Sequence, residues 1–314
     1  GEMRPVGKRF EPGRGAGSLS VVPKYIIITE GFSTEQVYFK ALRDSRSVAG
    51  ISGLIDIVLL QREPLDSGLS HPMVLLDLLD EYMDCVRARR YSVDLILETA
   101  CNALWVSTGI TRKDERMGRF RSEVREKSEE FGNGDMVDDV AGMTELCRKV
   151  ASSMFGADLS MDVPELIDYR PEVDQVCVIV DRDMDNRDAS VIDEFIRECR
   201  KRGYCPYISN PCFEIWLMMH FEAFDSEDLE TIRRNPMIDG KRFTEVELDR
   251  IVHEVNPDNG FSKTCFDPWM FMHRIGEAVD RSMGLEHDPL RLKWEAGTNL
   301  GELLYEMRSC ERIR

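Results

Sequence analysis

Three aspartates follow an apolar segment in the middle of the chain. Residues 176–180 read Val-Cys-Val-Ile-Val, and Asp181, Asp183 and Asp185 come directly after them at alternate positions. Carboxylates this close repel one another unless a positive charge lies among them, and oxygen ligands suit hard divalent cations. The pattern therefore indicates a site for Mg²⁺ (or Mn²⁺) at the end of a buried strand.

A second acid ends an apolar segment far upstream, where Glu30 follows Tyr-Ile-Ile-Ile-Thr. In an open parallel sheet, functional sites form at the carboxyl ends of the strands. We expect Glu30 and the aspartates to meet at that edge, together with Ser209 and Asn210. Helix capping is the plain alternative for Glu30, and for Asp185 with its neighbour Asp188, because acids favour helix N-termini.

The elements that would position these residues can be read from apolar patterning. Short β-branched runs predict strands at residues 25–29, 55–60, 176–180 and 204–209. A helix is predicted after the first strand, with Ser33 and Gln36 forming a capping box. Strand, helix and strand in this order imply a parallel sheet. The predicted fold class is α/β, an open parallel sheet flanked by helices.

The sheet-forming segments are separated by a long stretch with helical periodicity. Met73, Leu76, Leu79 and Met83 recur at helical spacing, and similar blocks continue to about residue 169. We therefore expect a large helical insertion within the core and a helical C-terminal part. The predicted divisions are a disordered tail at 1–20, an α/β core at 21–63 and 170–222, an insertion at 64–169, and a C-terminal region at 223–314.

Composition limits the classes of function. The chain has 314 residues, 42% of them hydrophobic, and no apolar run approaches the length that spans a membrane. Nine scattered cysteines without a Cys-x-x-Cys pair predict reduced, mostly buried thiols in the cytoplasm and no zinc site. The net charge of −17 argues against nucleic-acid binding by bulk attraction. Residues 111–127 carry seven basic and four acidic residues; a solvated helix face is the favoured interpretation, and contact with a phosphate backbone is the alternative.

Three motifs resemble the RloB-like family, which is part of the Toprim superfamily and linked with bacterial phage defence. They are residues 28–39 (Ile-Thr-Glu-Gly-x-x-Thr-Glu-x-x-Tyr-Phe), 181–185 (Asp-x-Asp-x-Asp) and 209–221 (Ser-Asn-Pro-Cys-Phe-Glu-Ile-Trp-Leu-x-x-His-Phe). The resemblance implies a Toprim-like sheet and a magnesium-dependent nuclease acting on RNA or DNA in anti-phage defence by abortive infection. Nucleic acid is the expected substrate, and a defence ATPase subunit is a further expected partner. Residues 296–299 (Ala-Gly-Thr-Asn) depart from the Asn-Pro-Ser-Thr-like stretch expected near the C-terminus.

The resemblance assigns the carboxylates their roles. Glu30, Asp181 and Asp183 correspond to the magnesium-binding acids, with Glu30 as a candidate acid or base, and Asp185 fits the extended motif. We expect Glu214 to be a further ligand or a supporting residue, and Lys263 or an arginine to neutralise developing charge. For Glu214, and for His220 in the same apolar helix, a structural hydrogen-bonding role is the alternative.

Two other functions stay open at this point. One is a catalytically inactive Toprim module that binds or regulates a defence ATPase. The other is a metal-dependent phosphatase, with Ser209 and Lys263 on later segments, or a nucleotidyl-type transferase. An EF-hand is excluded, because a loop counted from Asp181 has Asn186 and Ile192 where glycine and glutamate are required. A homo-oligomer is left open.

Overall fold

The computed structural model describes residues 21–60 and 71–310. The predicted tail at 1–20 and the first residues of the insertion, 64–70, lie outside the described residues. Five strands form the central sheet in the order β12-β7-β6-β1-β2. Four of them are parallel: β1 (Lys24–Thr29), β2 (Asp56–Leu59), β6 (Gln175–Asp181) and β7 (Cys205–Asn210). The predicted parallel sheet of an α/β protein is confirmed.

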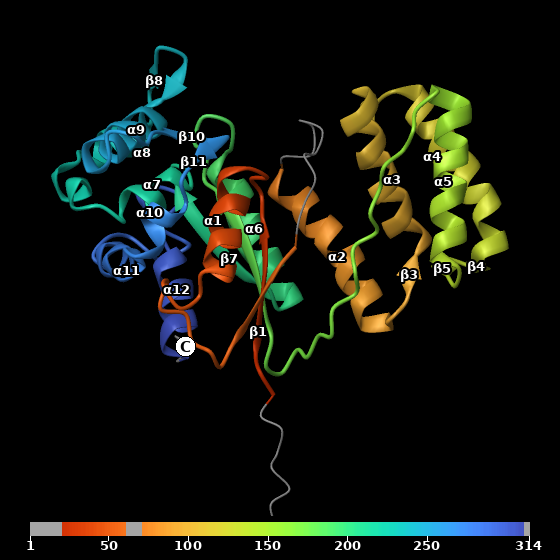
Figure 1. The fold of residues 1–314 in the computed structure, drawn as a ribbon, viewed down its shortest axis with the longest axis horizontal. Helices are drawn as coiled ribbons and strands as arrows, with labels where there is room; N and C mark the ends of the chain where they lie inside the picture. The colour runs from red at the N-terminus through yellow and green to blue at the C-terminus, as the bar shows by residue number, and fades with distance from the viewer. Residues whose placement is uncertain (1–20, 61–70, 311–314) are drawn as a thin grey trace, which may run out of the picture.

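The register of the strands brings their carboxyl ends to one edge. Thr29 of β1 lies beside Ile179 of β6, and Asp181 lies beside Ser209 of β7. The ladder continues one residue past β1, since the amide of Glu30 donates to the carbonyl of Ile179 at 2.9 Å. The ends of β1, β6 and β7 therefore point into the same region, at the top of the sheet in Figure 1.

Helices cover both faces of the sheet because the strands are apolar on both sides. Ile27 of β1 packs in one core cluster, whereas Ile26 and Ile28 pack in the other. The first cluster is completed by α1 (Thr34–Asp44), α7 (Glu214–Met218), α9 (Phe243–Val255), α11 (Ile275–Met283) and α12 (Leu300–Ser309). The second is completed by α2 (Pro72–Ala88) and α6 (Ala189–Arg202). This three-layer arrangement buries a continuous apolar strand such as β1.

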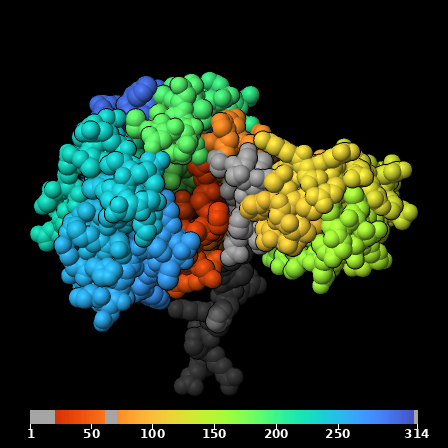
Figure 2. Space-filling model, turned by 90° about the horizontal axis from the view of Figure 1, so that it is seen from above, coloured from red at the N-terminus to blue at the C-terminus, as the bar shows by residue number. Residues whose placement is uncertain are grey.

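The insertion forms a lobe with its own core. Its helices are α3 (Val93–Thr108), α4 (Glu115–Lys127) and α5 (Val140–Phe155). A short sheet, β3 (Tyr91–Ser92), β4 (Gly132–Asn133) and β5 (Met136–Val137), joins them. Phe120, Leu97 and Met143 are fully buried among these helices. Figure 2 shows the lobe as a separate mass beside the rest of the molecule.

The C-terminal region combines helices with two hairpins. It contains η3 (Glu222–Ser226), α8 (Leu229–Arg234), the hairpin β8 (Met237–Ile238)–β9 (Lys241–Arg242), the hairpin β10 (Phe261–Ser262)–β11 (Cys265–Phe266), and α10 (Trp269–Met272). After α11, β12 (Gly297–Thr298) adds to β7 as an antiparallel edge strand. The region is therefore less uniformly helical than expected, and the second hairpin carries Lys263 at its turn.

The predicted capping box at the start of α1 is wrong. Ser33 occupies the cap position, but its side chain makes no cap hydrogen bond. Its hydroxyl donates instead to the carbonyl of Lys263, and Gln36 Nε2 donates to Thr29 Oγ1 at 2.9 Å. The reason is tertiary, because the β10–β11 hairpin packs against this turn and offers Ser33 a different acceptor.

Two predictions from composition can be compared with the described residues. Cys85, Cys147, Cys177 and Cys199 are buried free thiols, as expected. Among helices in the described part of the chain, none has the length and apolarity needed to cross a membrane.

Candidate active site at the carboxyl edge of the sheet

Asp181, the last residue of β6, lies at the centre of a carboxylate cluster. Its Oδ1 atom is buried and has no hydrogen-bond partner among the described residues. Burial raises the pKa of this carboxyl group well above its ordinary value, and the charges of Glu35, Glu214 and Glu30 raise it further. The positive charge of Lys263 opposes this rise but does not cancel it.

Glu35 is a member of this cluster that the sequence analysis missed. It lies in the first turn of α1 and is 8% exposed, with its carboxyl group against the Cα of Gly31. Burial, and then the charge of Glu214, raise its pKa to about 7. A glutamate in a first helical turn is ordinarily explained by the helix dipole. In the sequence, only its position in the first motif, four residues after Gly31, distinguished it.

Glu214 and Lys263 form an ion pair at the edge of the cluster. Glu214 begins α7 and is 2% exposed, and its Oε1 lies 3.2 Å from Nζ of Lys263. Its Oε2 is buried without a hydrogen-bond partner in the described residues. Burial disfavours the charged form of Lys263, but the charge of Glu214 and the smaller effects of other neighbours together outweigh it and raise the lysine pKa. The hairpin is held in place by Thr34 Oγ1, which donates to the Lys263 carbonyl at 3.0 Å.

Glu30 reaches the same edge but is held by an arginine. Nη1 of Arg187 lies 3.0 Å from Oε2 of Glu30, and Nη2 binds Oε1. The side chains of Arg187 and Glu30 are 9% and 12% exposed. The amide of Asp181 also points toward Glu30 Oε2, at 3.3 Å. Glu30 is therefore next to Asp181, as expected, and carries a buried counter-ion that the sequence did not indicate.

Asp183 and Asp185 diverge from Asp181 because the strand ends there. Asp183 adopts a left-handed backbone conformation with φ of 44°, and Asn186 Nδ2 lies 2.9 Å from each of its carboxylate oxygens. Asp185 is exposed and pairs with Arg242 at 2.5 Å. The alternate spacing of the aspartates in the sequence therefore does not place them on one face of a strand beyond Asp181. The capping role belongs to Asp188, whose carboxylate accepts from the amide of Ser190.

Polar groups on β7 bind neighbouring segments. The hydroxyls of Ser209 and Thr298 lie 2.9 Å apart, and Asn210 Nδ2 donates to the carbonyl of Leu292 at 2.7 Å. Asn299 Oδ1 accepts from the amide of Ile208 at 2.7 Å. The segment at 296–299, which departs from the family pattern, thus fastens the edge strand to β7.

His220 has a structural environment. It is fully buried, its Nε2 lies 3.1 Å from the hydroxyl of Tyr38, and its Nδ1 lies 2.9 Å from the carbonyl of Trp216. Burial lowers its pKa to about 3. A histidine that stays neutral and is held by aromatic neighbours supports the core, which is the alternative raised for it above.

The carboxylate cluster fits a hard cation by its chemistry, although its side chains are not preassembled. In residues 21–60 and 71–310, no three His, Cys, Asp or Glu side chains are arranged as a ready-made metal site. Two buried carboxylate oxygens, on Asp181 and Glu214, nevertheless lack partners, and Glu35 lies beside them. Carboxylate oxygens that lack hydrogen-bond partners are suitable ligands for Mg²⁺ or Mn²⁺. Glu30 would first have to leave Arg187.

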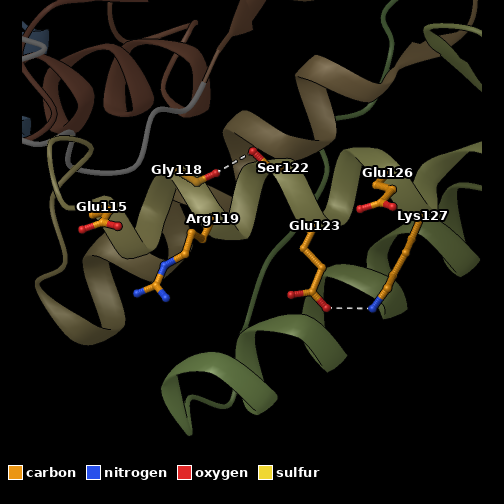
Figure 3. A pocket seen from close by; sticks show the side chains of 7 residues that line it. All are labelled: Glu115, Gly118, Arg119, Ser122, Glu123, Glu126 and Lys127. Atoms are coloured by element: carbon orange, nitrogen blue, oxygen red, sulfur yellow. Dashed lines mark hydrogen bonds and ion pairs between the residues drawn. The ribbon is translucent and has the colours of Figure 1, made fainter.

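The basic segment of the insertion lies elsewhere and is largely neutralised. An open depression runs along the exposed face of α4, where Arg119 and Lys127 lie beside Glu115, Glu123 and Glu126 (Figure 3). Five of the seven basic residues pair with acids: Arg112 and Arg121 with Glu98, Arg116 with Asp114, Arg125 with Asp94, and Lys127 with Glu123. This supports a solvated helix face over a phosphate-binding surface.

Comparison with known proteins identifies the family of the chain. The model of the RloB-like protein family matches residues 25–307, a range that spans the sheet, the insertion and most of the C-terminal region. The chain belongs to the RloB-like family. No curated protein and no solved structure matches it. Within this RloB-like chain, the matched range contains every residue of the carboxylate cluster.

Proposed function

We propose that this RloB-like protein is a metal-dependent nuclease that hydrolyses phosphodiester bonds in RNA or DNA. One observation carries the proposal: the buried carboxyl group of Asp181 has an unpartnered oxygen and is surrounded by three further acids at the carboxyl edge of a parallel sheet. Four acids here raise the energy of the fold, because their mutual repulsion is only partly offset by Arg187 and Lys263. A site that binds divalent cations and phosphate explains why they are together.

The position of each residue in the carboxylate cluster indicates its role in cation or phosphate binding. Asp181, Glu35 and Glu214 would hold a divalent cation, with Glu30 as a further ligand. Asp183, which the resemblance assigns to the metal, lies in the loop after β6, where its carboxylate binds Asn186. When bound, the cation would polarise the phosphate and stabilise charge on the leaving oxygen. Without a cation, burial and the charge of Glu214 raise the pKa of Glu35 to about 7; a bound cation would favour the ionised form that serves as its ligand. Lys263 stays protonated beside Glu214 and would neutralise charge on the phosphate.

The Toprim assignment and the role in anti-phage defence belong to the same proposal. The support for them is the sequence resemblance at residues 28–39, 181–185 and 209–221, and the parallel sheet that brings the acids of these segments together. A defence ATPase subunit is the partner included in this proposal.

The test is a cleavage assay with matched variants. Purified protein is incubated with plasmid, single-stranded DNA and total tRNA in Mg²⁺, Mn²⁺ or EDTA. The proposal expects cleavage that needs metal and is lost in Asp181→Asn. Asp162→Asn serves as the control, because it removes one carboxylate from an exposed position in the insertion. Cleavage that survives EDTA or Asp181→Asn contradicts the proposal.

A second candidate is the inactive regulatory module, and the Glu30–Arg187 pair favours it. A buried arginine already neutralises the acid that would otherwise complete the metal site. This candidate predicts no cleavage of any substrate, alone or with an ATPase partner, and no loss of partner binding in Asp181→Asn. The nuclease proposal predicts the opposite for cleavage.

A further inference from the structure

Arg187 lies in the loop between β6 and α6, at the point where the carboxyl ends of β1 and β6 meet. Its guanidinium binds both carboxylate oxygens of Glu30 and the main-chain carbonyl of Asp181. Its own backbone is fixed, since its amide donates to the carbonyl of Asp183 at 3.0 Å and its carbonyl accepts from Arg182 at 2.7 Å. The side chain can therefore change partners while the loop stays in place.

The charges around Arg187 do not balance. Among the described residues, four acids (Glu30, Glu35, Asp181 and Glu214) lie together, and the basic side chains that pair with them are Arg187 and Lys263. With every group ionised, the excess is two negative charges, which is the charge of one divalent cation. Arg187 satisfies Glu30 but leaves the buried oxygens of Asp181 and Glu214 without partners. A divalent cation drawn to those oxygens would compete with Arg187 for Glu30.

We propose that Arg187 is an exchangeable counter-ion and the phosphate-binding residue of this site. Without a cation it holds Glu30; when a divalent cation takes Glu30, the released guanidinium binds the non-bridging oxygens of the substrate phosphodiester. Arginine suits this exchange because its planar fork pairs with carboxylate and with phosphate in the same two-pronged geometry, and it stays charged in both states. The inference rests on the proposed function for the identity of the phosphate, whereas the competition for Glu30 can be measured without any reaction.

The first measurement is cation affinity by titration calorimetry. In Arg187→Gln the competitor is removed, so Mg²⁺ and Mn²⁺ should bind about tenfold more tightly than to wild type. Arg242→Gln is the matched control, because it removes an equal charge from an ion pair with Asp185 on the same loop. The control should bind within about twofold of wild type, since surface pairs contribute little. Equal or weaker affinity in Arg187→Gln, or equal tightening in both variants, overturns the exchange.

The second measurement is binding of a short phosphorothioate oligonucleotide, followed by fluorescence anisotropy in Ca²⁺ or in EDTA. Wild type should bind the oligonucleotide more tightly in Ca²⁺ than in EDTA, and Arg187→Gln should lose most of that gain in affinity. Arg187→Lys should be intermediate, because it keeps the positive charge but not the two-pronged geometry of the guanidinium. A full Ca²⁺-dependent gain in Arg187→Gln overturns the phosphate role. Thermal melting in Ca²⁺ confirms that the variants are folded, and the lysine variant decides the question if Arg187→Gln does not fold.

Different results would reject the nuclease proposal and the Arg187 exchange. Absence of cleavage by wild type with every metal and substrate rejects the nuclease, but it leaves the cation affinities of wild type and Arg187→Gln to be compared. Tighter binding in the variant then still supports competition for Glu30. Cleavage that needs metal together with unchanged cation affinity in Arg187→Gln supports the nuclease and rejects the exchange.

Discussion

Replacing Glu35 by glutamine should stabilise the metal-free protein. Burial and the charge of Glu214 raise the Glu35 pKa from 4.5 to about 7, which corresponds to about 3 kcal/mol of unfavourable free energy for the ionised form in the folded state. Glutamine has nearly the same shape and no charge. The variant should therefore unfold with a free energy up to about 3 kcal/mol higher than wild type in EDTA at alkaline pH.

The pH dependence of this difference follows from the sign of the shift. Between about pH 4.5 and 7, the folded state holds a proton on Glu35 that the unfolded state has released. The contribution of protonated Glu35 to the free energy of unfolding is therefore fully present below about pH 4.5, and it is lost as the pH rises through about 7. Wild type should lose stability across this window as Glu35 ionises, and the variant lacks this contribution. The advantage of Glu35→Gln should be small at about pH 5 and largest at about pH 8.

Urea denaturation followed by circular dichroism measures the difference, in EDTA and in saturating Mg²⁺. Glu222→Gln is the control, because that glutamate is exposed in η3. In Mg²⁺ most of the difference should disappear, since a cation at a hundredfold excess over its Kd adds about 2.7 kcal/mol to the protein that binds it. The reasoning is refuted if Glu35→Gln is no more stable than wild type in EDTA at about pH 8, or if the difference does not change with pH.

Two further predictions concern the neighbours of this acid. Lys263→Met removes the counter-ion of Glu214. It should lower the free energy of unfolding, measured in urea, by about 2 kcal/mol. The loss is smaller than for a fully buried pair because the lysine side chain is 46% exposed. Lys241→Met breaks a long pair with Glu245 (3.9 Å) in which the lysine is 54% exposed, and it should stay within about 0.5 kcal/mol of wild type. Equal losses in both variants would contradict the account. Gly31→Ala places a Cβ atom on the Glu35 carboxyl group. It should weaken Mg²⁺ binding about tenfold in calorimetry while the protein still folds, and unchanged affinity would show that Glu35 is not a ligand.

The sheet and the place of the site could be predicted because they depend on local patterns. Runs such as Ile26–Ile28 are apolar at every position, which is typical of strands covered on both faces. Given parallel strands, Glu30 and Asp181 must reach the same edge. The structure confirms the parallel sheet, and it places these two acids together.

The rest of the site depends on tertiary contacts that no local pattern specifies. Asp181 ends its strand, so the alternate spacing of the next two aspartates no longer places them on one side. Arg187 follows in an irregular loop whose conformation brings it back to Glu30. Glu35 lies where an acid is expected for helix stability, and its burial arises only when Glu214 and the β10–β11 hairpin pack against it.

Anomalous diffraction from crystals soaked in Mn²⁺ tests the central claim most directly, because it locates the cation without requiring a substrate. The account predicts a peak in contact with Asp181 Oδ1, with Glu35 and Glu214 turned toward it and Arg187 moved away from Glu30. In Asp181→Asn crystals the peak should be absent. Saturating Mn²⁺ without a peak at Asp181, with Arg187 still bound to Glu30, would contradict the claim that this cluster is a divalent-cation site.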